Sequence, residues 1–360
     1  MNKLLPKLEL LSSRVQTTFR KVFSRFPLIR IKEELFASQN HLFLVVIGLL
    51  TSMVILSLLQ EVSLAKHSPL LPSSTTYNLQ PLEKKNVVAK EVFGFAPYWT
   101  FEKLDNTDFD TLTTLAYFGV PVNSNGNLDR SDYGYQVFKS KQATRLFQKA
   151  HSNGTRVVLT LTQMNNGPIL AILDDPQAQE RLIEQAVAEV QGRGIDGINV
   201  DFEYDGNPGS VYRSRFTGLV ADLTKEMHRQ NPNSKVTVSV YAASARDPKL
   251  YDVGELAKVS DGVFMMAYDF AVAGSDTAMP TSPLYGHKEG QYWYDVSTAV
   301  DDFLKVMPAE KLILGVPWYG YNYVVNQPGI KANTLPFWYG QPVTQTYEVA
   351  QKNINGDLPG

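Results

Sequence analysis

Two carboxylic acids and one carboxamide alternate with apolar residues in the segment 196–203, which reads DGINVDFE. Asn199, Asp201 and Glu203 occupy every second position, so in a β-strand their side chains lie on one face. Crowded carboxylates repel each other, and burial disfavours their ionised forms, so such a cluster is costly for a fold. Clusters of this kind are typical of sites that carry out chemistry.

Short apolar runs alternate with amphipathic, helix-like segments after residue 90, and most runs are bounded by Gly, Pro, Asn or Asp. This alternation predicts buried parallel strands joined by helices, as in an α/β protein with a (β/α)8 TIM barrel of about 250 residues. An open doubly wound sheet is the competing architecture, but no glycine-rich phosphate loop follows the first run. The expected strands are 92–96, 113–120, 156–161, 197–202, 235–240, 262–267 and 312–316.

The predicted barrel, residues 91–360, contains seven such runs, and no convincing eighth run follows before Gly360. A barrel that lacks one strand leaves two unpaired strand edges, which are unfavourable. We therefore expect the barrel to be truncated before its last β/α unit.

The first 90 residues differ in composition from the rest. Residues 1–40 carry eight Lys or Arg against three Glu, a net charge of +5, so the remainder of this −2 chain carries −7. That negative charge argues against nucleic acid as a partner of the main domain. Residues 61–90 are rich in Ser, Pro, Thr and Lys without apolar periodicity, and they are interpreted as a linker.

Residues 42–59 (LFLVVIGLLTSMVILSLL) contain no charge and reach the length of a membrane-spanning helix. The basic residues before this run place the N-terminus in the cytoplasm and the chain after residue 60 outside. We therefore predict a basic cytoplasmic tail (1–40), a transmembrane anchor (41–60) and an extracytoplasmic barrel. A cleaved signal, with a small-x-small site at residues 63–65, and a buried core helix are the alternatives.

The residue inventory gives no indication of a metal or cofactor. The chain has no cysteine, and its five histidines show no ligand spacing. The acidic segment does not match the spacing of a calcium-binding EF-hand loop. No cofactor is expected.

Aromatic and acidic residues end the predicted strands at the edge where barrel active sites lie. Tyr268 and Asp269 follow the sixth run, Trp318 follows the seventh, and Tyr241 follows the fifth. Sugar rings stack on aromatic faces while their hydroxyls bond to charged groups, so this set favours a carbohydrate cleft. Trp99, after the first run, is interpreted either as a sugar-stacking residue or as part of the core.

The strand at 197–202 resembles the DxxDxDxE motif of glycoside hydrolase family 18, the chitinase-like enzymes. Asp196, Asp201 and Glu203 match that motif, and Asn199 stands where many members have a third aspartate. This asparagine and the later LGVPWYG segment are most similar to the bacterial cell-wall branch, such as the spore-cortex N-acetylglucosaminidases.

A second family motif, MxYD, matches Met266, Tyr268 and Asp269. Looser similarities, including VFGFAPYW, LAYFGV and SPLYG, extend the resemblance over residues 91–325. The family's SxGG motif on the third strand is absent here, where the chain reads LTLTQMNN. The candidate substrate-binding residues are Asp196, Asn199, Asp269, Met266, Trp99, Tyr241 and Trp318.

The resemblance implies a retaining mechanism in which the substrate's 2-acetamido oxygen attacks the anomeric carbon. Glu203 would be the general acid and then the base, with its pKa raised by partial burial and by Asp201. Asp201, expected to stay ionised, would orient the acetamido group, and Tyr268 would hydrogen-bond it. The substrate would then contain N-acetylglucosamine, as both peptidoglycan and chitin do.

Three hypotheses about the function of the chain compete. The first is a membrane-anchored glycosidase, and the second is a non-catalytic carbohydrate-binding module on the same barrel. Retention of Asp201 and Glu203 argues against the second, because a lectin has no need of a proton donor. The third is a membrane-tethered scaffold, whose site would tolerate the loss of every carboxylate. Separately, Asp196 and Glu203 could form a structural ion-pair set instead of a catalytic one.

Overall fold

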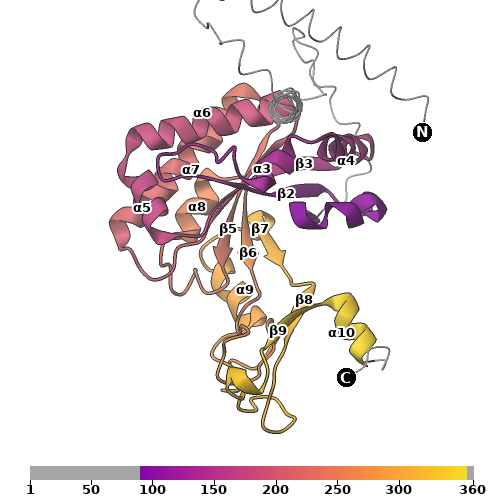
Figure 1. Ribbon diagram of the computed structural model, residues 1–360. Helices are drawn as coiled ribbons and strands as arrows, with labels where there is room; N and C mark the ends of the chain where they lie inside the picture. Colours follow the sequence, from indigo (N-terminus) through magenta and orange to yellow (C-terminus); the bar gives the residue numbers. More distant parts are fainter. Residues whose placement is uncertain (1–89, 355–360) are drawn as a thin grey trace, which may run out of the picture. The chain divides into compact units, whose positions relative to one another are not determined.

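The computed structural model describes residues 90–354, drawn in colour in Figure 1. The predicted tail at 1–40, the anchor at 41–60 and residues 61–89 of the linker lie outside the described residues. Among the described helices, none is long and apolar enough to cross a membrane.

Seven parallel strands form one sheet in the order of the chain, so each predicted apolar run is confirmed within two residues of its ends. Continuous burial explains why the sequence reveals them, since strands covered on both faces are apolar throughout. The strands are β1 (Phe93–Pro97), β2 (Thr114–Pro121), β3 (Arg156–Gln163), β4 (Gly197–Phe202), β5 (Lys235–Tyr241), β6 (Gly262–Met266) and β7 (Leu312–Gly315).

The sheet curls until its first strand faces its sixth. The ring of Phe264 on β6 lies 5.5 Å from that of Phe93 and 5.0 Å from that of Phe95, both on β1. In the described part of the chain, no ladder of hydrogen bonds joins β7 back to β1. The expected barrel is therefore present as a curled seven-stranded sheet with two unpaired edges.

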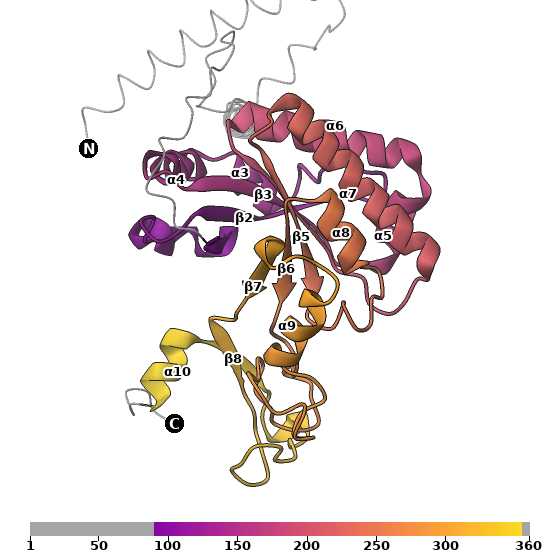
Figure 2. The ribbon, with the colours of Figure 1, turned by 180° about the vertical axis from the view of Figure 1, so that it is seen from behind.

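Helices cover the outer face of this sheet, as the view from behind in Figure 2 shows. Helix α6 begins as local chemistry requires: Asp175 accepts a hydrogen bond from the Gln177 amide, and Pro176 occupies the first turn. It ends at Gly194, whose φ of 62° is left-handed. The α-helices are α3 (Tyr133–Phe138), α4 (Lys141–Ser152), α5 (Asn166–Asp174), α6 (Pro176–Arg193), α7 (Ser210–Gln230), α8 (Val253–Val259), α9 (Val296–Leu304) and α10 (Tyr347–Ile354). The 3-10 helices are η2 (Tyr98–Asn106), η3 (Ala309–Lys311) and η4 (Phe337–Tyr339).

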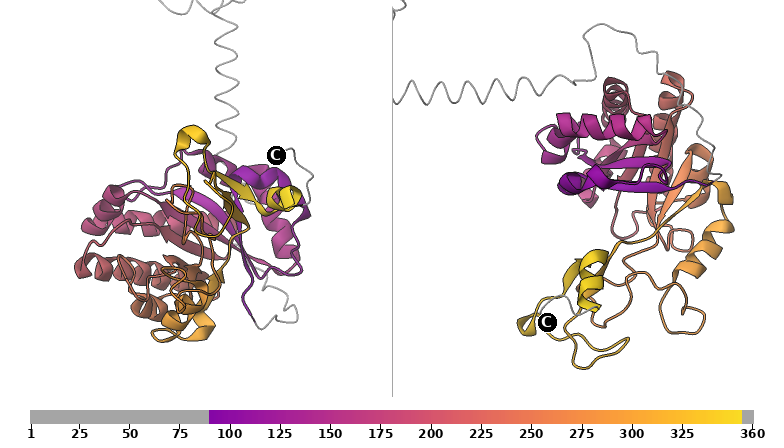
Figure 3. Two further views of the ribbon diagram at one scale, coloured as in Figure 1. Left: turned by 90° about the horizontal axis from the view of Figure 1, so that it is seen from below. Right: turned by 90° about the vertical axis from the view of Figure 1, so that its right-hand side faces the viewer.

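A two-stranded antiparallel hairpin, β8 (Tyr319–Asn322) with β9 (Val343–Thr346), stands apart from the barrel sheet. It extends from the carboxyl ends of β5, β6 and β7, and α10 follows it (Figures 1 and 3). We expected Trp318 to lie at the end of the seventh strand, but β7 ends at Gly315 and the hairpin begins at Tyr319, directly after Trp318. Pro317, which lacks an amide hydrogen, separates the two strands.

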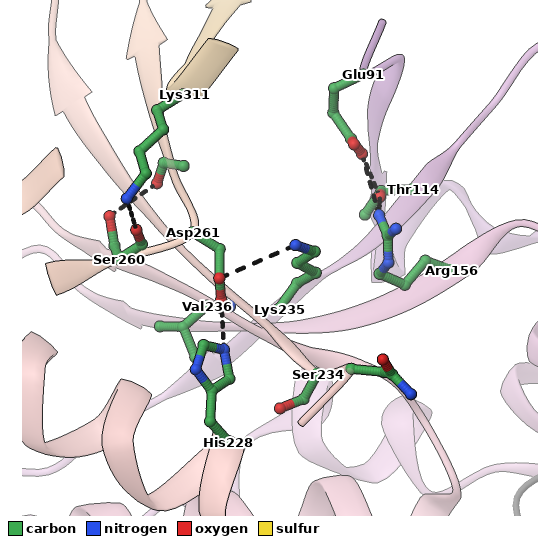
Figure 4. A network of polar contacts seen from close by, with 12 residues as sticks. Glu91, Thr114, Arg156, His228, Ser234, Lys235, Val236, Ser260, Asp261 and Lys311 are labelled. Atoms are coloured by element: carbon green, nitrogen blue, oxygen red, sulfur yellow. Dashed lines mark hydrogen bonds and ion pairs between the residues drawn. The ribbon is translucent and has the colours of Figure 1, made fainter. Parts of the chain in front are cut away.

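Polar residues join the amino ends of the strands, at the opposite end of the sheet from the hairpin. The carboxylate of Asp261, just before β6, accepts hydrogen bonds from the Val236 amide (2.8 Å) and pairs with His228 Nε2 (3.0 Å), as Figure 4 shows. Lys311 Nζ donates to the Ser260 carbonyl oxygen at 2.8 Å. These contacts fix the start of β6 against β5 and β7.

Candidate active site

A cleft of about 1130 Å³ opens at the carboxyl ends of the strands. Asp201 and Glu203 line this cleft, together with six of the other predicted residues. Two predicted residues do not line it, Asp196 and Asn199. The predicted residues that line the cleft are Asp201, Glu203, Tyr268, Asp269, Met266, Trp99, Tyr241 and Trp318.

Asp201 is almost fully buried at the bottom of this cleft, with 3% of its surface exposed. Burial first, and then repulsion from Glu203, raise the pKa of its carboxyl group to about 8, while a hydrogen bond from Ser239 opposes the shift. Among the described residues, its Oδ1 atom has no hydrogen-bond partner. The pKa of Asp201 is thus shifted towards the protonated form, the opposite direction to the expectation that it stays ionised, because the sequence does not show how deeply it is buried.

Glu203 follows the last residue of β4 and faces the same cleft. Burial raises the pKa of its carboxyl group, the charge of Asp269 raises it further, and a hydrogen bond from Tyr241 lowers it. The predicted increase in the pKa of Glu203 is confirmed, although the charge that adds to the increase is that of Asp269 and not that of Asp201. A raised pKa extends the pH range over which the carboxyl group carries the proton that a general acid must donate.

Asn199 has no exposed surface, and its carboxamide is used between strands. Its Nδ2 donates to Ser239 Oγ at 3.0 Å, and its Oδ1 accepts from Thr237 Oγ1 at 2.8 Å. Asn199 thus points to the inside of the barrel one layer below Asp201, and the prediction that it contacts substrate is not supported. It instead holds Ser239, which supports Asp201.

Asp196 lies just before β4, at the amino end of the strand. The strand separates it from Glu203 by about 20 Å, at about 3.3 Å per residue. Its Oδ2 accepts from the Val157 amide and pairs with His151 Nε2, both at 2.7 Å. This arrangement repeats that of Asp261, so the predicted substrate-binding role of Asp196 is wrong: both partners lie at the base of the barrel.

Replacing Asp196 with alanine should lower the free energy of unfolding by about 1–3 kcal/mol, because the Val157 amide loses its partner. Urea denaturation measures this loss. Asp261→Ala provides the comparison, since its carboxylate makes the same two contacts and one further ion pair, with Lys235 Nζ at 3.9 Å. A strand-end role for Asp196 is contradicted if Asp261→Ala destabilises the protein and Asp196→Ala does not.

Asp269 is anchored by hydroxyl groups from the hairpin. Its Oδ1 accepts from Tyr319 and Tyr321, each at 2.8 Å, and from Thr281 at 3.1 Å. Its φ of 57° is left-handed, a conformation that few residues other than glycine adopt without strain. The three donors hold the carboxylate next to Tyr268, whose ring lies 6.1 Å from that of Tyr319.

Two tryptophans form exposed walls of the cleft. Trp99 is 61% exposed and meets Phe118 edge-on, with ring centroids 5.8 Å apart. Trp318 is 73% exposed and meets Tyr347 edge-on at 5.5 Å. This exposure excludes the interpretation of Trp99 as a core residue and leaves the interpretation as a sugar-stacking residue. Both rings have a free surface on which a sugar can stack.

Several cleft residues were not predicted, because they come from loops or from positions whose role depends on curvature. Ser239 follows the alternation of β5 and could have been found from that pattern. Tyr321 does not line the cleft but holds Asp269, and it could have been found from the spacing of YGYNY, which places Tyr319 and Tyr321 on one face of β8. Arg246 and Lys249 lie in the loop after β5, where the sequence has no periodic signal.

The chain matches known proteins over the described barrel. The family described as "Glycosyl hydrolases family 18" matches residues 91–356. Di-N-acetylchitobiase from Mus musculus is 28% identical over 264 residues, covering 70% of this chain and 63% of that protein. "Putative sporulation-specific glycosylase YdhD" from Bacillus subtilis is 28% identical over 185 residues, covering 49% of this chain and 40% of that protein. The match thus spans less than two thirds of the length of these relatives.

Solved structures show the same fold. The Group IV chitinase of Ostrinia furnacalis, in complex with allosamidin, superposes with a TM-score of 0.62 at 22% identity, covering 74% of this chain and 78% of that one. The chitinase of Cycas revoluta, in complex with (GlcNAc)3, gives 0.62 at 23% identity, covering 73% of this chain and 80% of that one. With the family match over most of the barrel, the curled sheet and the paired acids of β4, the chain belongs to glycosyl hydrolase family 18.

Proposed function

We propose that this protein is a glycosidase that hydrolyses a polysaccharide containing N-acetylglucosamine, by a retaining mechanism assisted by the substrate. The observation that carries the proposal is the pair of acids at the carboxyl end of β4, the buried Asp201 and the half-buried Glu203, both with raised pKa values in one cleft. The exposed faces of Trp99 and Trp318 support a sugar ligand.

In the proposed reaction, Glu203 donates its proton to the glycosidic oxygen while the acetamido oxygen of the sugar attacks the anomeric carbon. The Oδ1 atom of Asp201, which has no partner among the described residues, accepts a hydrogen bond from the acetamido N–H. The carboxylate of Glu203 then removes a proton from the water that opens the cyclic intermediate. Tyr268 and Asp269 flank the acetamido group at the cleft wall.

We further propose that residues 42–59 anchor the protein in a membrane, with residues 1–40 in the cytoplasm and the barrel outside. The uncharged run and the basic residues before it support this topology. Such an anchor would place the cleft next to cell-wall peptidoglycan.

Digestion by the full-length protein tests the activity. Purified peptidoglycan and chitin oligomers are incubated with the detergent-solubilised chain, and product masses and anomeric configuration are read by mass spectrometry and NMR. Products with retained configuration support the proposal. Binding of the oligomers without any product would favour a non-catalytic carbohydrate-binding module.

Tyr321→Phe should raise KM about three- to tenfold with a smaller change in kcat, because Asp269 loses one of its three hydroxyl donors and the hairpin loosens. Steady-state kinetics on a chromogenic chito-oligosaccharide measure the effect. Tyr323→Phe is the matched control, since its hydroxyl donates to the Val272 carbonyl oxygen at 2.9 Å and not to Asp269. Equal effects of the two substitutions would contradict a specific role for the Asp269 contact.

A further inference from the structure

Two cations line a cleft whose other charged residues are acidic. Both come from the loop between β5 and α8, outside the motifs that identify the family. A neutral polymer such as chitin has no group that needs a cation. The charged lining residues are Asp201, Glu203, Asp247, Asp269, Arg246 and Lys249.

Lys249 is fixed in place by its backbone. Its φ of 44° is left-handed, a strained conformation for a residue with a side chain. Its carbonyl oxygen accepts a hydrogen bond from Arg213 Nη1 at 2.7 Å, which ties the loop to α7. The left-handed backbone of Lys249 and its hydrogen bond to Arg213 together set the direction in which its side chain leaves the loop.

The Lys249 ammonium group lies over an aromatic ring that contacts the proton donor. Nζ is 5.5 Å from the centroid of the Tyr241 ring, within the range of a cation–π contact. Tyr241 in turn hydrogen-bonds Glu203. The positive charge is thus one side chain away from the proposed proton donor, Glu203.

Lys249 is the available cation of the two. Arg246 has its guanidinium 5.7 Å from the Tyr294 ring centroid and its Nη1 3.3 Å from His287 Nε2, so it already has partners. Lys249 forms no ion pair with any described residue, and Asp247, two positions away, does not neutralise it within 4 Å. A lysine held in this way over a sugar cleft has its charge available for an anionic group of the substrate.

We propose that Lys249 binds a carboxylate carried by the amino-sugar polymer, and that the cleft therefore prefers a carboxylated N-acetylhexosamine glycan to neutral chitin. This inference rests on the proposed function and names its substrate class. In peptidoglycan the carboxylate can come from the lactyl ether of the muramic acid residue or from the peptide attached to it. Both sources present the same anionic group to the ammonium.

Binding by the full-length Glu203→Gln protein tests the inference without turnover. Calorimetry compares three ligands of equal glycan length: neutral chitotetraose, a peptide-free tetramer of alternating N-acetylglucosamine and N-acetylmuramic acid, and the same tetramer with its peptides. Lys249→Met in this background should weaken binding of a carboxylated ligand about tenfold at low salt and change chitotetraose binding less than twofold. A loss with the peptide-free tetramer assigns the lactyl carboxylate, and a loss confined to the peptide-bearing tetramer assigns the peptide.

Two variants control the comparison. Lys249→Arg keeps the charge and should restore most of the preference, whereas Lys258→Met removes an exposed lysine paired with Glu255 and should change nothing. Equal losses for all three ligands, or no loss for any, would overturn the inference. If the wild-type chain cleaves no ligand but the Lys249-dependent preference persists, the proposed function fails and the carboxylate site stands. If the wild-type chain cleaves the ligands but shows no preference that depends on Lys249, the proposed function stands and the carboxylate site fails.

Discussion

Glu203→Gln is expected to lower kcat about 10²–10⁴-fold while the dissociation constant for sugar changes only a few-fold. Glutamine has nearly the shape of the glutamic acid, so the cleft wall formed by Trp99, Trp318 and Tyr241 is preserved. The amide cannot protonate the glycosidic oxygen or take a proton from water. Initial rates on peptidoglycan fragments or chito-oligosaccharides, together with calorimetry, separate the two effects.

The pH profile gives a second readout for this variant. Because the pKa of Glu203 is raised, the wild-type rate should persist to a higher pH than an ordinary glutamic acid allows, and then fall as Glu203 loses its proton. The residual activity of Glu203→Gln should lack that alkaline limb. Glu255→Gln, on the outer helix α8, is the control and should behave as wild type. Turnover by Glu203→Gln close to the wild-type rate would reject the proposed mechanism.

The strands were predictable because burial on both faces leaves a continuous apolar run, which needs no knowledge of the remaining chain. The β8–β9 hairpin was not, because it depends on contacts distant in sequence, such as those from Tyr319 and Tyr321 to Asp269. Its strands are short, with β8 half-buried and β9 mostly exposed, and neither has a continuous apolar run.

The residues of the β4 motif show the limit of period-two reasoning at a site. Alternation shows on which face of the strand a side chain lies, but not how far along the strand the residue is from the cleft. Asn199, Asp201 and Glu203 do share a face, yet Asn199 lies one layer too deep to reach the cleft. Asp196 belongs to the other end of the strand, where His151 and the Val157 amide bind it. Depth also raises the pKa of Asp201, which its sequence neighbours do not reveal.

Asp201→Asn should stabilise the protein at alkaline pH and impair catalysis at the same time. The pKa of Asp201 is about 8 in the folded protein, against the usual value of 3.8. Between these two values the unfolded chain has released the proton that the folded chain still holds, so stability falls as the pH rises from about 4 to about 8. Asparagine removes this pH-dependent contribution to stability, because it is neutral in both the folded and the unfolded chain. The expected gain in the free energy of unfolding is about 5 kcal/mol at pH 8 and near zero at pH 4.

Urea denaturation of the wild type and of Asp201→Asn at both pH values measures that gain, with the exposed Asp222→Asn as control. A gain that does not depend on pH would contradict the raised pKa. The same substitution should lower kcat about 10²-fold, because an amide cannot become negative as positive charge develops on the acetamido ring. Folding would favour a neutral residue at this position, whereas the proposed chemistry requires one that can ionise. The cost of burying Asp201 is therefore best understood as part of the catalytic machinery, and the two measurements on one variant test that connection.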